Sequence, residues 1–161
     1  MSIKLTPTWF IKDYLSISIE FLKKQSIKTI FADIDNTLVE WDELDTNEAL
    51  QAWVQELKEN QIEIILVSNN RKHRIERVAE QLDVPYVFPG LKPLHKGFKE
   101  ALSQTTATKD EIVMIGDQLL TDILGAGTFG IRTILVKPLK VSDAKKTRVN
   151  RFFENVILTI L

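Results

Sequence analysis

Residues 28–38 run Lys-Thr-Ile-Phe-Ala-Asp-Ile-Asp-Asn-Thr-Leu, a short apolar segment that leads into two aspartates. The β-branched and aromatic residues up to Ile34 predict a buried parallel strand. Asp33 and Asp35 lie two positions apart at the end of this strand, so both can face one side. In an open α/β sheet, ligands bind at the carboxyl ends of the strands. The segment therefore predicts a parallel sheet with acidic groups at its ligand-binding edge.

Short apolar runs alternate with helix-patterned stretches along the chain, which predicts βαβ units. We expect strands at residues 28–34, 62–67, 86–88, 111–115 and 131–136. Apolar side chains recur at helical spacing between them, and we expect helices at 47–60, 71–82, 93–103 and 119–129. The prediction is an α/β fold of three layers with a doubly wound, Rossmann-like parallel sheet. Residues 1–161 should form one domain, with a core at about 27–137.

Aromatic residues mark both flanks of this core. Thr6 followed by Pro7 is typical of a helix start, which predicts a helix that carries Trp9, Phe10, Tyr14 and Leu15. A closing helix is expected from about 144 to 161. We expect both apolar stripes to pack on the domain, and contact with a membrane is the alternative.

The composition excludes several kinds of site. The 161 residues include no cysteine, so disulfides, thiolate chemistry and cysteine-bound zinc are excluded. The two histidines, His73 and His95, are too few for a histidine-only metal site and lie in basic, helix-type sequence. The N-terminus lacks a basic segment followed by an apolar one, and no apolar run could cross a bilayer. We therefore expect a soluble, cytoplasmic protein.

Charge is distributed unevenly along the chain. Residues 1–30 carry a net charge of +3 and residues 137–161 carry +4, which leaves −8 for residues 31–136. The acidic body argues against nucleic acid as a partner. The basic ends could contact anionic lipid at the inner membrane face, or they could simply be solvated helix faces.

Polar residues also follow the next predicted strands. A hydroxyl and free N–H groups at a helix start, as in Ser68-Asn69-Asn70, suit a phosphate oxygen, although an ordinary N-cap is the alternative. Lys92 lies in the loop before Pro93, where it is either a fixed positive charge or a surface lysine.

The fourth polar segment is Gly116-Asp117-Gln118-Leu119-Leu120-Thr121-Asp122, which follows the predicted strand 111–115. The glycine permits a tight turn, and Asp117 falls at the end of the strand. Three strands thus deliver acidic and hydroxyl groups to one edge of one sheet. This combination predicts an active site, where each segment alone would not.

In this order the segments resemble the four motifs of the haloacid dehalogenase (HAD) superfamily. The sequence resembles more closely the YqeG-type subclass IIIA phosphatases, which are relatives of mitochondrial phosphatidylglycerophosphate phosphatase. The resemblance spans nearly the whole chain and rests on residues 33–38, 67–70, 92–93 and 116–122. The chain departs from that family at residues 125–128, Gly-Ala-Gly-Thr, where the family has Gly-Gly-Asn-Arg.

The resemblance implies a hydrolase that works through a phosphorylated aspartate. Asp33 would be the nucleophile, and Asp35 would protonate the leaving group and later deprotonate water. Ser68, Asn69 and Lys92 would bind the substrate phosphate.

The resemblance also implies Mg²⁺ as the cofactor. Asp33, Asp117 and the main-chain carbonyl of Asp35 would supply oxygen ligands, which Mg²⁺ prefers. Thr37 would support the loop, and Asp122 would orient Lys92 or a water molecule.

The spacing between the motifs leaves no room for a cap domain, so we expect an open site. An open site favours a bulky substrate, such as a phospholipid headgroup, a nucleic-acid end or a phosphoprotein. The resemblance favours phosphatidylglycerophosphate, with peripheral membrane contact. A phosphatase of nucleic-acid ends or soluble phosphomonoesters, and a non-catalytic binding protein of the same fold, are the alternatives.

Overall fold

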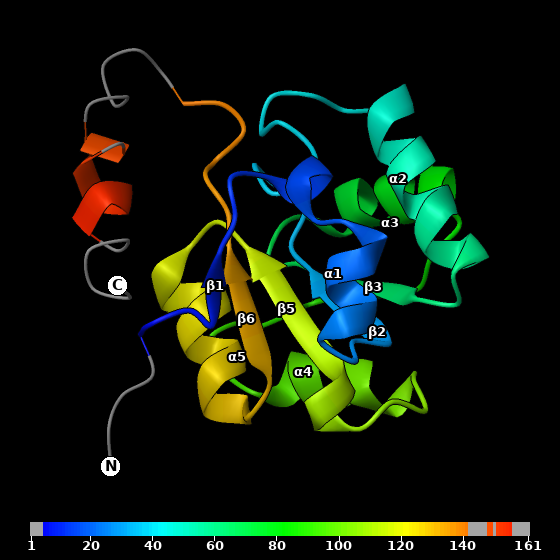
Figure 1. Ribbon diagram of the computed structural model, residues 1–161. Helices are drawn as coiled ribbons and strands as arrows, with labels where there is room; N and C mark the ends of the chain where they lie inside the picture. Colours follow the sequence, from blue (N-terminus) through cyan, green and yellow to red (C-terminus); the bar gives the residue numbers. More distant parts are fainter. Residues whose placement is uncertain (1–4, 142–147, 150, 156–161) are drawn as a thin grey trace.

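A parallel sheet forms the middle layer of the structure (Figure 1). The computed structural model describes residues 5–141, 148–149 and 151–155. The strands are β1 (Trp9–Phe10), β2 (Thr29–Ala32), β3 (Glu63–Val67), β4 (Tyr86–Val87), β5 (Ile112–Gly116) and β6 (Arg132–Leu135). They lie in the order β1-β6-β5-β2-β3-β4, with parallel neighbours throughout. All five strands expected from the sequence are therefore confirmed, and β1 is added to them.

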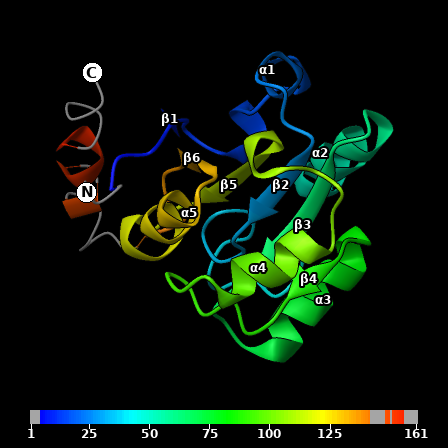
Figure 2. The same ribbon diagram turned by 90° about the horizontal axis from the view of Figure 1, so that it is seen from below.

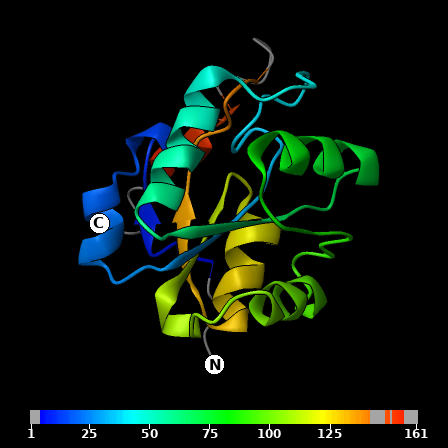
Figure 3. The same cartoon turned by 90° about the vertical axis from the view of Figure 1, so that its right-hand side faces the viewer.

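Helices cover both faces of the sheet. The α-helices are α1 (Ile19–Lys24), α2 (Glu48–Glu59), α3 (Lys72–Leu82), α4 (Lys96–Ser103) and α5 (Leu124–Phe129). Shorter turns are η1 (Tyr14–Ser16), η2 (Lys109–Glu111) and the π-helical η3 (Leu119–Ile123). Figure 3 shows α2 and α3 on one side of the sheet and α4 and α5 on the other. This is the predicted three-layer, doubly wound α/β architecture.

Strand β2 explains why the sheet needs both helical layers. Ile30 and Ala32 point to the side of α1, α2 and α3, whereas Phe31 points to the side of α4 and α5. All three side chains are completely buried. A strand that is buried on both faces is apolar throughout rather than alternating, as the sequence of β2 is.

The chain changes direction between β2 and β5, which fixes the place for a ligand. From β2 it proceeds outward to β3 and β4, and it then returns to β5 and continues outward to β6 on the other side. The loops after β2 and β5 thus leave in opposite directions and open a crevice at the carboxyl edge. Between Asp35 and Ser68 the chain forms a loop, α2 and β3, and between Ser68 and Lys92 it forms α3 and β4. Neither segment forms a cap domain.

The helix predicted from Thr6 onward is wrong. Trp9 and Phe10 form the edge strand β1, which pairs with Ile134 and Leu135 of β6 (Figure 2). The backbone groups on the outer edge of β6 require partners, and extended aromatic residues supply them. Helical structure begins later, with the short turn η1 and then α1.

Two other helix predictions change at their ends. The helix expected from Pro93 begins at Lys96, and the residues before it form the loop that carries Lys92. The closing helix expected at 144–161 lies mostly outside the described residues, although 148–149 and 151–155 are helical. Phe153 from this segment packs against Phe10 and Leu135. Among the residues described, no helix has the length and apolar character needed to cross a membrane.

Replacing Leu66 with alanine tests the packing of the sheet. Leu66 is completely buried in β3, so its truncation removes contacts and leaves a cavity. We expect the free energy of unfolding in urea to fall by about 2–5 kcal/mol. The control is Leu44→Ala, because this side chain is 65% exposed, and its effect should stay below about 0.5 kcal/mol. Equal effects of the two substitutions would contradict the described core.

Candidate active site

Three buried aspartates meet at the crevice between β2 and β5. Asp33 follows β2, Asp117 follows β5, and Asp122 lies in η3, and one carboxylate oxygen of each lies within 4.8 Å of the others. The backbone N–H of Asp33 donates to the carbonyl of Ile115 over 3.1 Å, which continues the pairing of β2 with β5 as far as the site. The sheet itself therefore positions the acidic groups.

Gly116 makes room for Asp122. A Cβ atom at position 116 would lie 2.3 Å from the Asp122 side chain, so any larger residue would displace this carboxylate. Asp122 also accepts a hydrogen bond of 3.1 Å from the backbone N–H of Gln118, which secures the turn into η3. A glycine is thus required at position 116 so that the Asp122 side chain can lie against the backbone there.

Lys92 enters the site from the loop after β4. Its ammonium lies 2.9 Å from an Asp33 oxygen and 2.6 Å from an Asp122 oxygen, and only 5% of the residue is exposed. The Asn69 side chain holds the loop in place: its amide N–H donates to the Lys92 carbonyl, and its oxygen accepts from the Lys92 N–H, both over 2.9 Å. In this arrangement Asn69 positions Lys92, and the phosphate contact expected of Asn69 stays a prediction.

Ser68 and Thr37 line the same edge. Ser68 is buried at the end of β3, and its hydroxyl accepts a hydrogen bond of 3.1 Å from the Asn70 N–H. The Thr37 hydroxyl donates to Asp117 over 3.0 Å. Asn36 adopts a left-handed conformation with φ of 59°, which turns the chain so that Thr37 comes back towards β5. The loop after β2 is therefore tied to the acidic cluster.

The side chain of Asp35 faces a different set of partners. Its carboxylate receives Nε of Arg74 at 2.6 Å and the side-chain amide of Asn70. Arg74 also donates to the carbonyls of Glu43 and Glu40, at 2.5 and 3.2 Å. Asp35 thus lies outside the cluster of carboxylates, and one arginine connects it to the loop at 40–43.

Sequence reasoning missed Arg74 and the contact of Asn70 with Asp35. A weak signal was available for Arg74, because a positive charge in the first turn of a helix opposes the helix dipole. Its position in α3 indicated a role other than helix stabilisation, but the sequence could not identify the partner.

Burial and charge shift the acidity of these groups. Burial raises the pKa of Asp33 to about 6, although Lys92 acts in the opposite direction. Burial and the neighbouring carboxylates of Asp33 and Asp122 raise the pKa of Asp117 to about 8. Burial alone would lower the pKa of Lys92, but the two carboxylates raise it above its ordinary value. At Asp33 the attraction of Lys92 exceeds the repulsion from Asp122, so burial is the main reason why the pKa of Asp33 is raised.

This donor set fits a divalent cation. When all groups are ionised, three carboxylates carry three negative charges against one positive charge on Lys92. The remaining excess equals the charge of one divalent metal ion, and carboxylate oxygens are its usual ligands. The site thus combines a cluster of three carboxylates, a buried ammonium and, beside them, a separately held carboxylate.

Comparison with known proteins agrees with this arrangement. Residues 30–91 match the family described as haloacid dehalogenase-like hydrolase, and residues 91–150 match the HAD-hydrolase-like family. The probable phosphatase YqeG of Bacillus subtilis is 42% identical over 155 residues, which cover 96% of this chain and 90% of that protein.

Solved structures show the same fold at low identity. A HAD-superfamily hydrolase from Ehrlichia chaffeensis has a TM-score of 0.55 and 16% identity, over 81% of this chain and 98% of that one. The cobalt-bound deoxy-D-mannose-octulosonate 8-phosphate phosphatase of Haemophilus influenzae has a TM-score of 0.51 and 18% identity. That match covers 59% of this chain and only 61% of the other. The family matches, the relative and the fold together show that this chain is a HAD-superfamily phosphatase of the YqeG type.

Proposed function

We propose that this phosphatase hydrolyses phosphomonoesters in a Mg²⁺-dependent reaction through an aspartyl-phosphate on Asp33. The observation that carries the proposal is the position of Asp33, which contacts the Lys92 ammonium at 2.9 Å and lies within 4.8 Å of Asp117. A nucleophile that must approach an anionic phosphate needs positive charge beside it, and this position supplies that charge.

The cofactor would be held by Asp33 and Asp117, with the main-chain carbonyl of Asp35 as a third ligand. When bound there, Mg²⁺ would supply positive charge that offsets the charge of the substrate phosphate beside the carboxylates. Burial, and after it the carboxylates of Asp33 and Asp122, raise the pKa of Asp117 to about 8, and a cation here would favour the charged carboxylates, which supports the assignment. Asp122 is engaged by Lys92 and by Gln118, so we assign it to positioning Lys92.

The protein side chains would divide the reaction between them. An Asp33 oxygen attacks phosphorus as the bond to the leaving oxygen breaks, and Asp35 gives that oxygen a proton. Lys92 and the Ser68 hydroxyl hold the equatorial oxygens, where charge must be neutralised. Asp35 then takes a proton from water, which attacks phosphorus and regenerates Asp33 with release of phosphate. Arg74 and Asn70 would hold Asp35 in position for both proton transfers.

Phosphatidylglycerophosphate is the substrate that we propose. The chain has no cap domain between its motifs, so a large substrate can reach Asp33. Beside Asp117 lies a groove of about 580 Å³ whose lining includes the apolar side chains of Leu119, Leu120 and Phe152. Such a groove suits the hydrocarbon part of a lipid and offers little to a small hydrophilic ester. The family resemblance supports the same choice.

Asp33→Asn should abolish phosphate release from both phosphatidylglycerophosphate and a generic aryl phosphate. The amide has the shape of the carboxylate but cannot act as the nucleophile, so we expect a loss of at least about a thousandfold in kcat. A chelator should stop the native protein and added Mg²⁺ should restore it. The control is Asp110→Asn at the opposite edge of the sheet, which should retain full activity.

The same assay separates the possible outcomes. A strong preference for the lipid in kcat/KM would support phosphatidylglycerophosphate, and equal rates would favour a soluble phosphomonoester. Acid-quenched native protein should carry a phosphoryl group on the peptide that contains Asp33, detectable by mass spectrometry. Turnover that survives in Asp33→Asn would overturn the mechanism, and no turnover of either ester would favour a binding protein.

Without a divalent cation, the melting temperature should fall as the pH rises from about 5 to 8. Folded Asp117 has a pKa of about 8, whereas the unfolded chain loses this proton near pH 4. The stability that the protonated Asp117 contributes is therefore complete below about pH 4. It is lost as the pH rises through the pKa of Asp117 in the folded protein. Asp33, with a pKa of about 6, acts in the same direction.

Calorimetry in a chelator and in millimolar Mg²⁺ checks this expectation. Mg²⁺ should remove most of the fall, because the cation replaces the proton between the carboxylates. In the chelator, Asp117→Asn should flatten the profile, since the amide has no proton to lose. A native protein whose melting temperature is constant or rises over this range would contradict the assignment.

Arg74→Gln should slow the hydrolysis of alkyl phosphates far more than that of aryl phosphates. Arg74 positions Asp35, and the proton from Asp35 matters most for a poor leaving group. We expect kcat to fall about ten- to a hundredfold for an alkyl phosphate and less than about fivefold for an aryl phosphate. Arg77→Gln, one turn further along α3 and half-exposed, is the matched control. An equal fall for both esters would indicate a merely structural role.

A further inference from the structure

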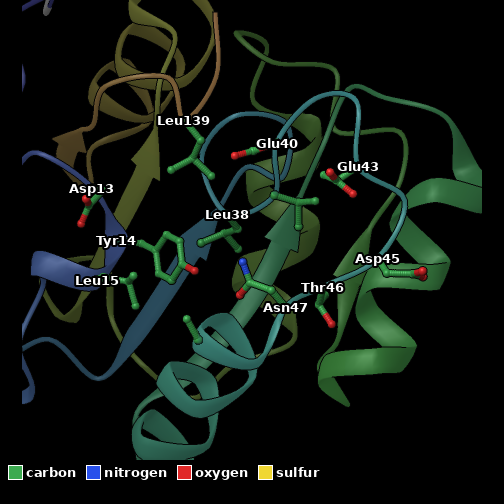
Figure 4. Close-up of a pocket in the computed structure, with 12 residues that line it drawn as sticks. Asp13, Tyr14, Leu15, Leu38, Glu40, Glu43, Asp45, Thr46, Asn47 and Leu139 are labelled. Atoms are coloured by element: carbon green, nitrogen blue, oxygen red, sulfur yellow. The ribbon is translucent and has the colours of Figure 1, made fainter.

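A second cavity lies on the other side of the loop that follows β2. It has a volume of about 490 Å³ and is enclosed by η1, residues 38–49 and Leu139 (Figure 4). Asp33, Lys92 and Asp117 are not among its lining residues, so this cavity is separate from the proposed catalytic set. Its wall combines carboxylates with aliphatic side chains.

The carboxylates around this cavity exceed the positive charges available to them. Asp45 is paired with Arg77 at 2.7 Å. Asp13, Glu40 and Glu43 also line the cavity, and within residues 5–141 none of the three has a cationic side chain in ion-pair contact. The lysine near Glu40 and Glu43, Lys140, is already paired with another aspartate, so negative charge remains in excess around the cavity.

Tyr14 provides an independent sign of a ligand. Its ring is buried against Trp53, with 5.2 Å between centroids, and only 3% of the residue is exposed. Figure 4 shows its hydroxyl directed into the cavity, and no hydrogen-bond partner for it occurs in the described part of the chain. Burial and the Asp13 carboxylate raise the pKa of Tyr14, so the hydroxyl keeps its proton. Among the described residues no enclosed side-chain oxygen lacks a partner, so the Tyr14 hydroxyl is open to the cavity and available to a ligand there.

The form of the cavity restricts the kind of cation. Asp13 lies on one side and Glu43 and Asp45 on the other (Figure 4), and leucine, valine and alanine side chains line the space together with the polar Thr46 and Asn47. A single hydrated metal ion would leave most of this volume and all of the aliphatic wall without a role. A methylene chain with an ammonium group at each end matches both features, because its chain can cover apolar surface while its ends meet carboxylates.

We propose that this cavity binds a linear organic diammonium or polyammonium ion. The ammonium groups donate to Asp13 at one end and to Glu40 or Glu43 at the other, and the Tyr14 hydroxyl accepts one further hydrogen bond. This site goes beyond the proposed function, since it requires no phosphate ester.

The position of the cavity gives its ligand a route to the active site. Val39 lines the cavity and forms a bridge with Asp35 in the backbone. The carbonyls of Glu40 and Glu43 accept hydrogen bonds from Arg74, which pairs with Asp35. A ligand bound by the side chains of Glu40 and Glu43 would therefore contact the loop that Arg74 connects to Asp35, the proposed acid–base residue.

Isothermal titration of the full chain with 1,4-diaminobutane and with spermidine tests the proposal. We expect saturable binding to one site, at least about tenfold tighter than that of butylamine, which carries a single ammonium. Mg²⁺ at the same concentration should not compete for the site. Because no ester is present, failure of the phosphatase mechanism would not affect this result.

Matched variants decide whether the cavity is the site. Glu43→Gln and Tyr14→Phe should each weaken spermidine binding by about fivefold or more, since each removes one polar partner and keeps the shape. Glu80→Gln on the exposed face of α3 makes the same charge change elsewhere and should bind as the native protein does. The proposal is overturned by the absence of saturable binding, by equal binding of butylamine, or by an equal effect of Glu80→Gln, which would indicate diffuse attraction to an acidic protein.

Discussion

The buried ammonium of Lys92 holds the active edge of this protein together. It contacts one carboxylate at the end of β2 and another in the turn after β5, so a single charge links the two strands at which the sheet changes direction. Burying charged groups is unfavourable unless each finds a partner, and this arrangement supplies partners within 3 Å. The loop of Lys92 is in turn fixed by both polar atoms of one asparagine side chain, Asn69.

Most of the fold could be predicted because the apolar strands and the amphipathic helices are encoded locally. The aspartates at 33 and 117 were predictable for the same reason, since each directly follows a buried strand and adjacent parallel strands end at one edge. The remaining features depend on distant partners. Strand β1 is two residues long and forms only beside β6, so its aromatic residues were assigned to a helix. The contact of Arg74 with Asp35 depends on how a loop folds over α3.

The loop after β2 lies between two acidic regions of the molecule. On one side, Thr37 binds Asp117 in a crowded acidic cluster that requires positive charge. On the other side, Glu40 and Glu43 contribute to a second acidic surface. Arg74 crosses between them, since it pairs with Asp35 and binds the backbone of both glutamates. The geometry of the proposed proton donor therefore depends on a loop whose outer face carries two glutamates.

Strand β1 has a consequence for how the molecule avoids self-association. Two residues, supported by reciprocal 3.0 Å hydrogen bonds between Thr8 and Thr133, cover the outer edge of β6. These threonines are 125 residues apart, so during synthesis the early segment has no edge to join until nearly all of the sheet exists. Closing so long a segment is slow and costs entropy. Until closure, β6 would present open N–H and carbonyl groups to other chains, and so a strand of only two residues protects the nascent sheet from aggregation.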